Sequence, residues 1–260
     1  MEVHTHTHTA RKKWTHYFWE FFMLFLAVTL GFFVENQREH LIEHKRANAF
    51  AASMLNDLKD DTANLRSLEK RYRYAASNID TFLLLVENNN IEKIPGGKLY
   101  WYGLWGGFIN PFVPNDATFQ EMKSSGSLRY IQNRELAHKI ALYDQQVRKI
   151  QMMVAQDGPV YIETRKARAR IFDFRYNKAA NEMVQVMYKA WANESTFNTG
   201  PVDSFLATSP PLLTYDKTVL NEYIEFCRSR ALGRLAESLT ILHMLAIEII
   251  NELKTEYHLK

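Results

Sequence analysis

Apolar residues follow two different patterns along this chain. From Phe21 to Val34 they form an unbroken run, whereas from Glu35 to Pro95 they recur every seven residues. A continuous run predicts a helix that is apolar on all sides, and a heptad repeat predicts a helix with one apolar face. Because no helix breaker separates the two segments, we expect one long helix to contain both.

The apolar run is short for a membrane span, but its flanks lengthen it. A helix needs ~20 apolar residues to cross the hydrocarbon core of a bilayer. A basic cluster followed by aromatic residues precedes the run, in the order typical of a membrane interface. The small residues that mark signal-peptide cleavage are missing after Phe33. We therefore predict an uncleaved transmembrane anchor over residues 14–35. The flanking residues are Arg11, Lys12, Lys13, Trp14, Tyr17 and Trp19.

Basic residues on both sides of the anchor predict its orientation. The cluster at residues 11–13 is tighter and closer to the span than Arg38, Lys45 and Arg46. Since cytoplasmic flanks carry the excess of Lys and Arg, we expect a cytoplasmic N-terminus and an extracytoplasmic body at the cell inner membrane.

Glu20 lies within the predicted anchor, where an ionisable side chain is costly and often functional. It can reach the headgroups or pair with the basic residues at 11–13. Its spacing to Leu24, Ala27 and Gly31 also places all four residues on one helix face. Ala27 and Gly31 form a small-xxx-small pair, which lets two helix backbones approach closely in lipid. This face is predicted to mediate self-association or docking on another membrane helix.

Two apolar seams run along the rest of the long helix. Five heptads in register predict packing on other helices in coiled-coil fashion, although Asp61 interrupts the second seam. The charged residues on the opposite side, which include Glu69, are predicted to face solvent. The first seam is Ala51, Leu58, Leu65, Tyr72, Ile79 and Val86, and the second is Ala47, Met54, Leu68, Ala75 and Phe82.

Turn-forming residues divide the remainder of the chain. They predict loops near residues 88–117 and 193–214. The first loop contains the aromatic segment 99–112, which is expected to cap the helical core, with a ligand pocket or a membrane contact as the alternatives.

Helix caps mark two further helices with apolar faces. Asn133 and Asp216 are predicted N-caps, and the helix after Asp216 extends to Leu253, long enough to pair antiparallel with the first helix. The basic segment at 164–170 is expected to be a solvated helix face. Cys227 and His243 fall on or beside the last apolar face, where we expect them to be buried.

The predicted fold class is therefore all-α. A single transmembrane helix continues into the long helix of an antiparallel, coiled-coil-like helical bundle. Three segments are expected: a disordered His/Thr-rich tail at 1–13, the anchor at 14–35 and the bundle domain at 36–260.

Composition narrows the range of functions. The chain has 32 basic and 29 acidic residues among 260, a net charge of +3, which is too balanced to predict nucleic-acid binding. Its single cysteine excludes an internal disulfide. The histidines of the tail lack any fixed geometry for a metal, so no cofactor is predicted.

One short motif resembles a catalytic one. His40, Glu43 and His44 match the H-x-x-E-H pattern of inverzincin metalloproteases, and Glu121 lies at about the distance of their third ligand. The motif needs a protease context, and here it leads into a heptad repeat. We interpret it as a coincidence and expect no enzyme, with an HLIEH metalloenzyme as the only exception.

Several stretches resemble a family of N-terminally membrane-anchored, helix-rich proteins of unknown function from Bacteroidota. The resemblance covers the anchor, the first long helix and the segment 118–131, and it implies a membrane protein of the cell envelope. It brings no activity and no catalytic residues. The resembling stretches are Lys12–Phe21, LFLAVTLGFFVENQREH at 24–40, Met54–Asp61 and TFQEMKSSGSLRYI at 118–131.

These observations favour a membrane-anchored scaffold or interaction protein. Its expected partners are the lipid bilayer and either a second copy or another membrane protein. The alternative is an accessory subunit of an ion-relay or sensory complex that uses Glu20 or the aromatic segment 99–112.

Overall fold

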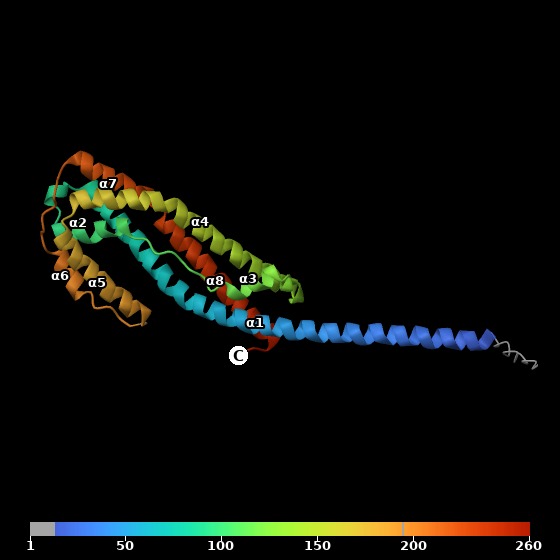
Figure 1. Cartoon of the computed structure of the whole chain (residues 1–260). Helices are drawn as coiled ribbons and strands as arrows, with labels where there is room; N and C mark the ends of the chain where they lie inside the picture. Colours follow the sequence, from blue (N-terminus) through green and yellow to red (C-terminus); the bar gives the residue numbers. More distant parts are fainter. Residues whose placement is uncertain (1–13, 194) are drawn as a thin grey trace, which may run out of the picture. The chain divides into compact units, whose positions relative to one another are not determined.

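All the regular elements in the described part of the chain are helices. The computed structural model describes residues 14–193 and 195–260, which are 83% helical and contain no strands (Figure 1). The prediction of an all-α fold is therefore confirmed. The elements are α1 (Trp14–Asn88), η1 (Ile91–Lys93), α2 (Gly96–Gly103), η2 (Leu104–Gly107), α3 (Ala117–Ser124), η3 (Ser127–Tyr130), α4 (Arg134–Ile171), α5 (Phe174–Ala192), α6 (Gly200–Leu206), α7 (Lys217–Ser229) and α8 (Leu232–Tyr257).

Helix α1 contains both apolar patterns of the sequence. It has 75 residues and no interruption, as the lack of a helix breaker predicted. The chain nevertheless forms two compact units, which meet between Phe50 and Ala51 within this helix. The unit from Ala51 onward holds the hydrophobic core.

The heptad seams of α1 are the side of the helix that the core buries. Leu65 and Ala75 are completely buried and Tyr72 is 1% exposed, whereas Val86 is only half-buried. Asp61, which interrupts the second seam, is also completely buried. The seams were therefore correctly predicted as a buried face.

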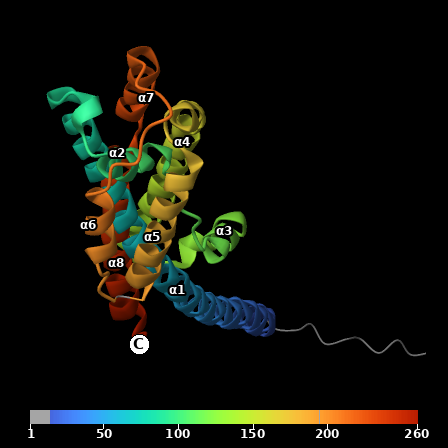
Figure 2. The ribbon, with the colours of Figure 1, turned by 90° about the vertical axis from the view of Figure 1, so that its left-hand side faces the viewer.

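Helix α8 is completely buried along one side and packs on α4. Its Thr240 also forms hydrogen bonds with Glu69 and Arg73 of α1. Its neighbour α4 lies beside it in both views (Figures 1 and 2). Lys139 at the start of α4 pairs with Glu252 near the end of α8, while Met153 further along α4 meets Ser238 near the start of α8. These two helices therefore run in opposite directions.

The N-caps that the sequence indicated are present. The Asn133 side chain accepts hydrogen bonds from the backbone of Glu135 and Leu136 at the start of α4. The Asp216 carboxylate accepts from Thr218 and Val219 at the start of α7. Each cap satisfies backbone donors that have no partner within the helix.

Helices also form inside both predicted loops. The first loop contains α2 and the second contains α6. These short helices pack on each other, and both contact α5 (Figure 2). Their formation follows from packing, since Tyr100 and Trp101 of α2 are almost completely buried in the core.

The helix predicted over residues 217–253 is divided in two. Helix α7 ends at Ser229 and α8 begins at Leu232, although neither glycine nor proline occupies the break. Arg230 takes an extended backbone conformation there, with φ −66° and ψ 138°. Its side chain is buried and bonded to other elements, so tertiary contacts end the helix.

Pro159 lies inside α4, which continues to Ile171. A proline in a helix interior costs about 3 kcal/mol because it removes a backbone donor and clashes with the preceding turn. Beyond it, Thr164, Ala167 and Ile171 are all buried. The burial of this last part of α4 offsets the cost.

Candidate functional site

The predicted association face lies along one side of the N-terminal part of α1. Glu20, Leu24, Ala27 and Gly31 are all exposed. A Cβ atom added at Gly31 would meet no atom within 4 Å, so the backbone there is open to close approach. A shallow hollow runs along the same side. It is lined by His16, Trp19, Glu20, Met23, Leu24 and Ala27.

The carboxylate of Glu20 is paired within its own helix. Its Oε1 lies 3.3 Å from Nε2 of His16, one turn earlier. The predicted basic partners at residues 11–13 lie outside the described part of the chain. Sequence reasoning missed His16, although its i, i+4 spacing to Glu20 was the available signal.

The motif that resembles a metalloprotease site also lies on exposed α1. Nδ1 of His40 is 3.8 Å from Glu43, and His44 is exposed one turn after His40. Within residues 14–193 and 195–260, no group of three or more His, Cys, Asp or Glu side chains is placed to hold a metal ion.

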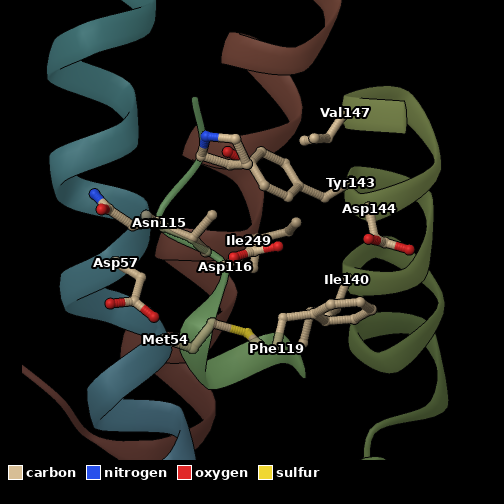
Figure 3. Close-up of a pocket in the computed structure, with 12 residues that line it drawn as sticks. Met54, Asp57, Asn115, Asp116, Phe119, Ile140, Tyr143, Asp144, Val147 and Ile249 are labelled. Carbon is tan, nitrogen blue, oxygen red and sulfur yellow. The ribbon is translucent and has the colours of Figure 1, made fainter. Parts of the chain in front are cut away.

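A small pocket opens between α1, α4, α8 and the segment that leads into α3 (Figure 3). Its cavity volume is about 40 Å³, which suits a few water molecules. Carboxylates of Asp57, Asp116 and Asp144 come from three different elements, and Asp144 pairs with Arg148. The apolar lining residues are Met54, Leu58, Pro114, Phe119, Ile140, Val147 and Ile249.

Asp61 lies beside this pocket and binds two of its lining residues. The Tyr143 hydroxyl donates to Oδ2 over 2.6 Å, and the Asn115 backbone N–H donates to Oδ1 over 2.8 Å. Burial raises the pKa of Asp61, and these two hydrogen bonds oppose the rise. The polar position in the seam therefore joins α1 to α4 and to the segment before α3.

Arg230 and Asp157 form an ion pair whose side chains are each 1% exposed. Nη2 of Arg230 lies 2.7 Å from Oδ2 of Asp157, and the guanidinium also donates to the carbonyls of Gly106 and Phe108. The backbone N–H of Ala231 donates to the same carboxylate over 3.1 Å. Both buried charges therefore have ion-pair and hydrogen-bond partners, without which their burial would destabilise the fold.

Glu69 is not the solvated residue that the charge pattern predicted. Its Oε1 accepts hydrogen bonds from Thr240 at 2.8 Å and from Arg73 at 3.0 Å, and its Oε2 lies 3.4 Å from Nδ1 of His243. These bonds lower the pKa of Glu69, although burial opposes them as the largest single effect. The Glu69 side chain faces α8, so its carboxylate links α1 to α8.

The aromatic segment 99–112 packs into the core. Trp101 and Trp105 are each 1% exposed, and their rings meet edge to face at 6.2 Å. A glycine is required at position 106, where a Cβ would lie 2.6 Å from the Tyr223 hydroxyl. The expectation that this segment covers the core is met, and its tryptophans do not face solvent.

The basic segment after Pro159 is solvated only in part. Arg165, Lys166 and Arg170 are exposed, but Arg168 turns inward and donates from Nη1 to the Leu104 carbonyl over 3.1 Å. Burial lowers the pKa of Arg168. Arg168, which was predicted to face solvent, therefore forms a hydrogen bond that fixes η2 against α4.

Comparison with protein-family models, with curated proteins and with solved structures finds no match.

Proposed function

We propose that this protein is a single-pass, membrane-anchored helical scaffold or interaction protein of the cell envelope. One observation carries the proposal: α1 contains a stretch near its start that is long and apolar enough to cross a membrane, and none of that stretch is buried. Phe32 is 75% exposed and Phe21 is 67% exposed.

Exposure of this many large apolar side chains to water is costly. Each buried Å² of apolar surface contributes about 25 cal/mol, and soluble monomers rarely expose contiguous apolar patches of more than a few hundred Å². A lipid bilayer removes this cost, and the helix satisfies its own backbone hydrogen bonds, as the hydrocarbon core demands.

The face of Glu20, Leu24, Ala27 and Gly31 is the proposed contact for a partner. Small residues at 27 and 31 admit a second backbone, and the glutamate can form a hydrogen bond across the contact. The partner is a second copy of this chain or another membrane helix. We further propose that the body is an antiparallel, coiled-coil-like bundle that presents this anchor.

The proposed orientation places the N-terminus in the cytoplasm and the body outside it, at the inner membrane. The tight basic cluster at residues 11–13 supports this direction by the positive-inside rule.

Cysteine labelling tests the anchor and its orientation. The variant combines Cys227→Ala with Lys260→Cys, and intact cells are treated with a membrane-impermeant maleimide. Labelling of position 260 without lysis is expected. Labelling only after lysis contradicts the orientation, and recovery of the unmodified protein in the soluble fraction after cell breakage contradicts the anchor itself.

A second candidate function uses the pair formed by Glu20 and His16. Two titratable groups 3.3 Å apart within the proposed span suit a proton or ion relay beside a channel subunit. Glu20→Gln should then fail to complement a deletion strain, while full complementation excludes the relay. The sensory alternative has less support, because Trp101 and Trp105 are buried.

A further inference from the structure

A second, more polar pocket lies on a different side of α1. Asn64, Ser67 and Arg71 are three or four residues apart and therefore share one helix face. The segment 110–113 crosses in front of them, and the cavity between has a volume of about 280 Å³. Asn110 and Val113 line the cavity from this crossing segment.

Among residues 14–193 and 195–260, the Arg71 guanidinium in this pocket has no carboxylate within 4 Å. Its buried Nε has no hydrogen-bond partner among the protein groups there. The guanidinium makes a cation–π contact with the face of Tyr188, whose ring centroid lies 4.3 Å from Cζ of Arg71. Arg230 differs sharply, since its guanidinium is matched by Asp157 and two carbonyls.

Neighbouring groups leave the charge of Arg71 uncompensated. Burial raises the pKa of Tyr188, so its phenol stays neutral at physiological pH and adds no negative charge. The buried Ser67 Oγ also has no hydrogen-bond partner within the described structure. Lys70, which precedes Arg71 in α1, lies 4.7 Å from the ring centroid of Trp191 and does not line this pocket.

The front wall of the pocket is fixed in place. The Tyr72 hydroxyl donates to the Asn110 carbonyl over 2.9 Å and accepts from the Asn110 N–H over 3.3 Å. The Tyr72 ring also meets Phe108 edge to face at 4.9 Å. Because Tyr72 is itself buried, segment 110–113 is held at a set distance from α1, and the pocket is preformed.

We propose that this pocket binds a small organic anion through a carboxylate or phosphate group. The guanidinium of Arg71 supplies a planar fork of N–H donors that matches two oxygens of such a group. The Ser67 hydroxyl and the amides of Asn64 and Asn110 are the neutral donors nearby. The proposal concerns the body alone and does not depend on the scaffold function or on the anchor.

Titration calorimetry of the full-length protein in mild detergent tests the proposal. Succinate and inorganic phosphate are the probes, and choline is the cationic comparison. Saturable binding of at least one anion and none of choline is expected. Hydrogen bonds to a charged group account for a loss of about tenfold to a hundredfold in affinity for Arg71→Gln.

Two further variants separate binding from folding. Val113 is 75% exposed, so Val113→Trp should leave the fold intact and obstruct the cavity, again weakening binding at least tenfold. Arg66→Gln removes a charge from the exposed side of α1 that does not line the cavity, and it should bind as the unmodified protein does.

Three results would overturn the proposal. They are the failure of the folded, unmodified protein to bind either anion saturably, equal affinities for the unmodified protein and Arg71→Gln, and binding that Val113→Trp leaves unchanged.

Discussion

At the scale of single residues, Asp61 is a carboxylate buried among the apolar residues of the α1 seam. The seam of α1 identifies position 61 as buried, and the carboxylate there conflicts with that position. Its two hydrogen-bond donors, Tyr143 and Asn115, lie far away along the chain.

The raised pKa of Asp61 predicts a pH dependence of stability. Well below its ordinary pKa of 3.8 the carboxyl is neutral in both folded and unfolded chains. As the pH rises, the unfolded chain ionises first, so the folded state loses stability until the pH passes the raised pKa. Asp61→Asn cannot ionise, and its free energy of unfolding should therefore rise relative to the unmodified protein between pH 3.5 and 6.5.

Urea unfolding at the two pH values measures this change. Asp60→Asn, which removes an exposed charge from the same helix, is the control for charge alone. A relative stability of Asp61→Asn that falls with increasing pH would contradict the prediction.

Arg230 and Asp157 give a prediction for a buried charge pair. Arg230→Met alone should lower the free energy of unfolding by about 3–5 kcal/mol, because Asp157 is then left buried without its partner. Arg230→Met combined with Asp157→Leu should cost less than the sum of the two single variants. Denaturant titration of all four proteins checks the coupling, and strict additivity would argue against it.

At the level of elements, the backbone at Pro210 lies so close to α2 that only glycine fits at position 96 without strain. A Cβ at Gly96 would lie 1.9 Å from the Pro210 carbonyl oxygen. Gly96→Ala should therefore destabilise the protein by about 1–3 kcal/mol, as overpacking does. Gly233→Ala in α8, where a Cβ meets nothing within 4 Å, should leave stability unchanged or raise it by about 0.5–1 kcal/mol. Thermal unfolding of both variants measures the difference in stability. Equal shifts in their melting temperatures would contradict this prediction.

The proposed anchor offers a matched test of its proposed association face. Ala27→Ile and Gly31→Ile add bulk where close approach is proposed, and they should reduce self-association or partner recovery at least tenfold in sedimentation or crosslinking assays. Thr29→Ile adds bulk on the opposite side of the same helix and is the control. Equal effects of all three variants would place the contact elsewhere.

The sequence predicted those helices whose buried face or first turn is determined by residues nearby in the chain. Heptad seams and side-chain caps lie within a few residues of what they determine, so α1 and the starts of α4 and α7 follow from the sequence. The break at Arg230 and the course of α4 through Pro159 depend on contacts between distant segments. For the same reason, the seam pattern identified Arg71 neither as a core residue nor as part of a pocket.

For the whole molecule, the proposed anchor and the core belong to different units. The compact unit from Ala51 to Lys260 contains the hydrophobic core, and the exposed apolar stretch lies before it. A variant lacking residues 1–36 should remain in the supernatant after high-speed centrifugation without detergent, while retaining its helical circular dichroism. Sedimentation of this variant with the membranes would show that the body holds the protein there.

The contacts of Arg230 with Asp157, Gly106 and Phe108 also affect how the structure opens locally. One guanidinium links the α7–α8 connection to α4 through Asp157 and to the end of η2 through two carbonyls. Separation of α4 breaks the buried ion pair, and separation of η2 breaks two charge-assisted hydrogen bonds. The amide protons of these segments should therefore exchange with deuterium at one shared rate, as a cooperative unit, and Arg230→Met should divide that unit into segments with separate exchange rates.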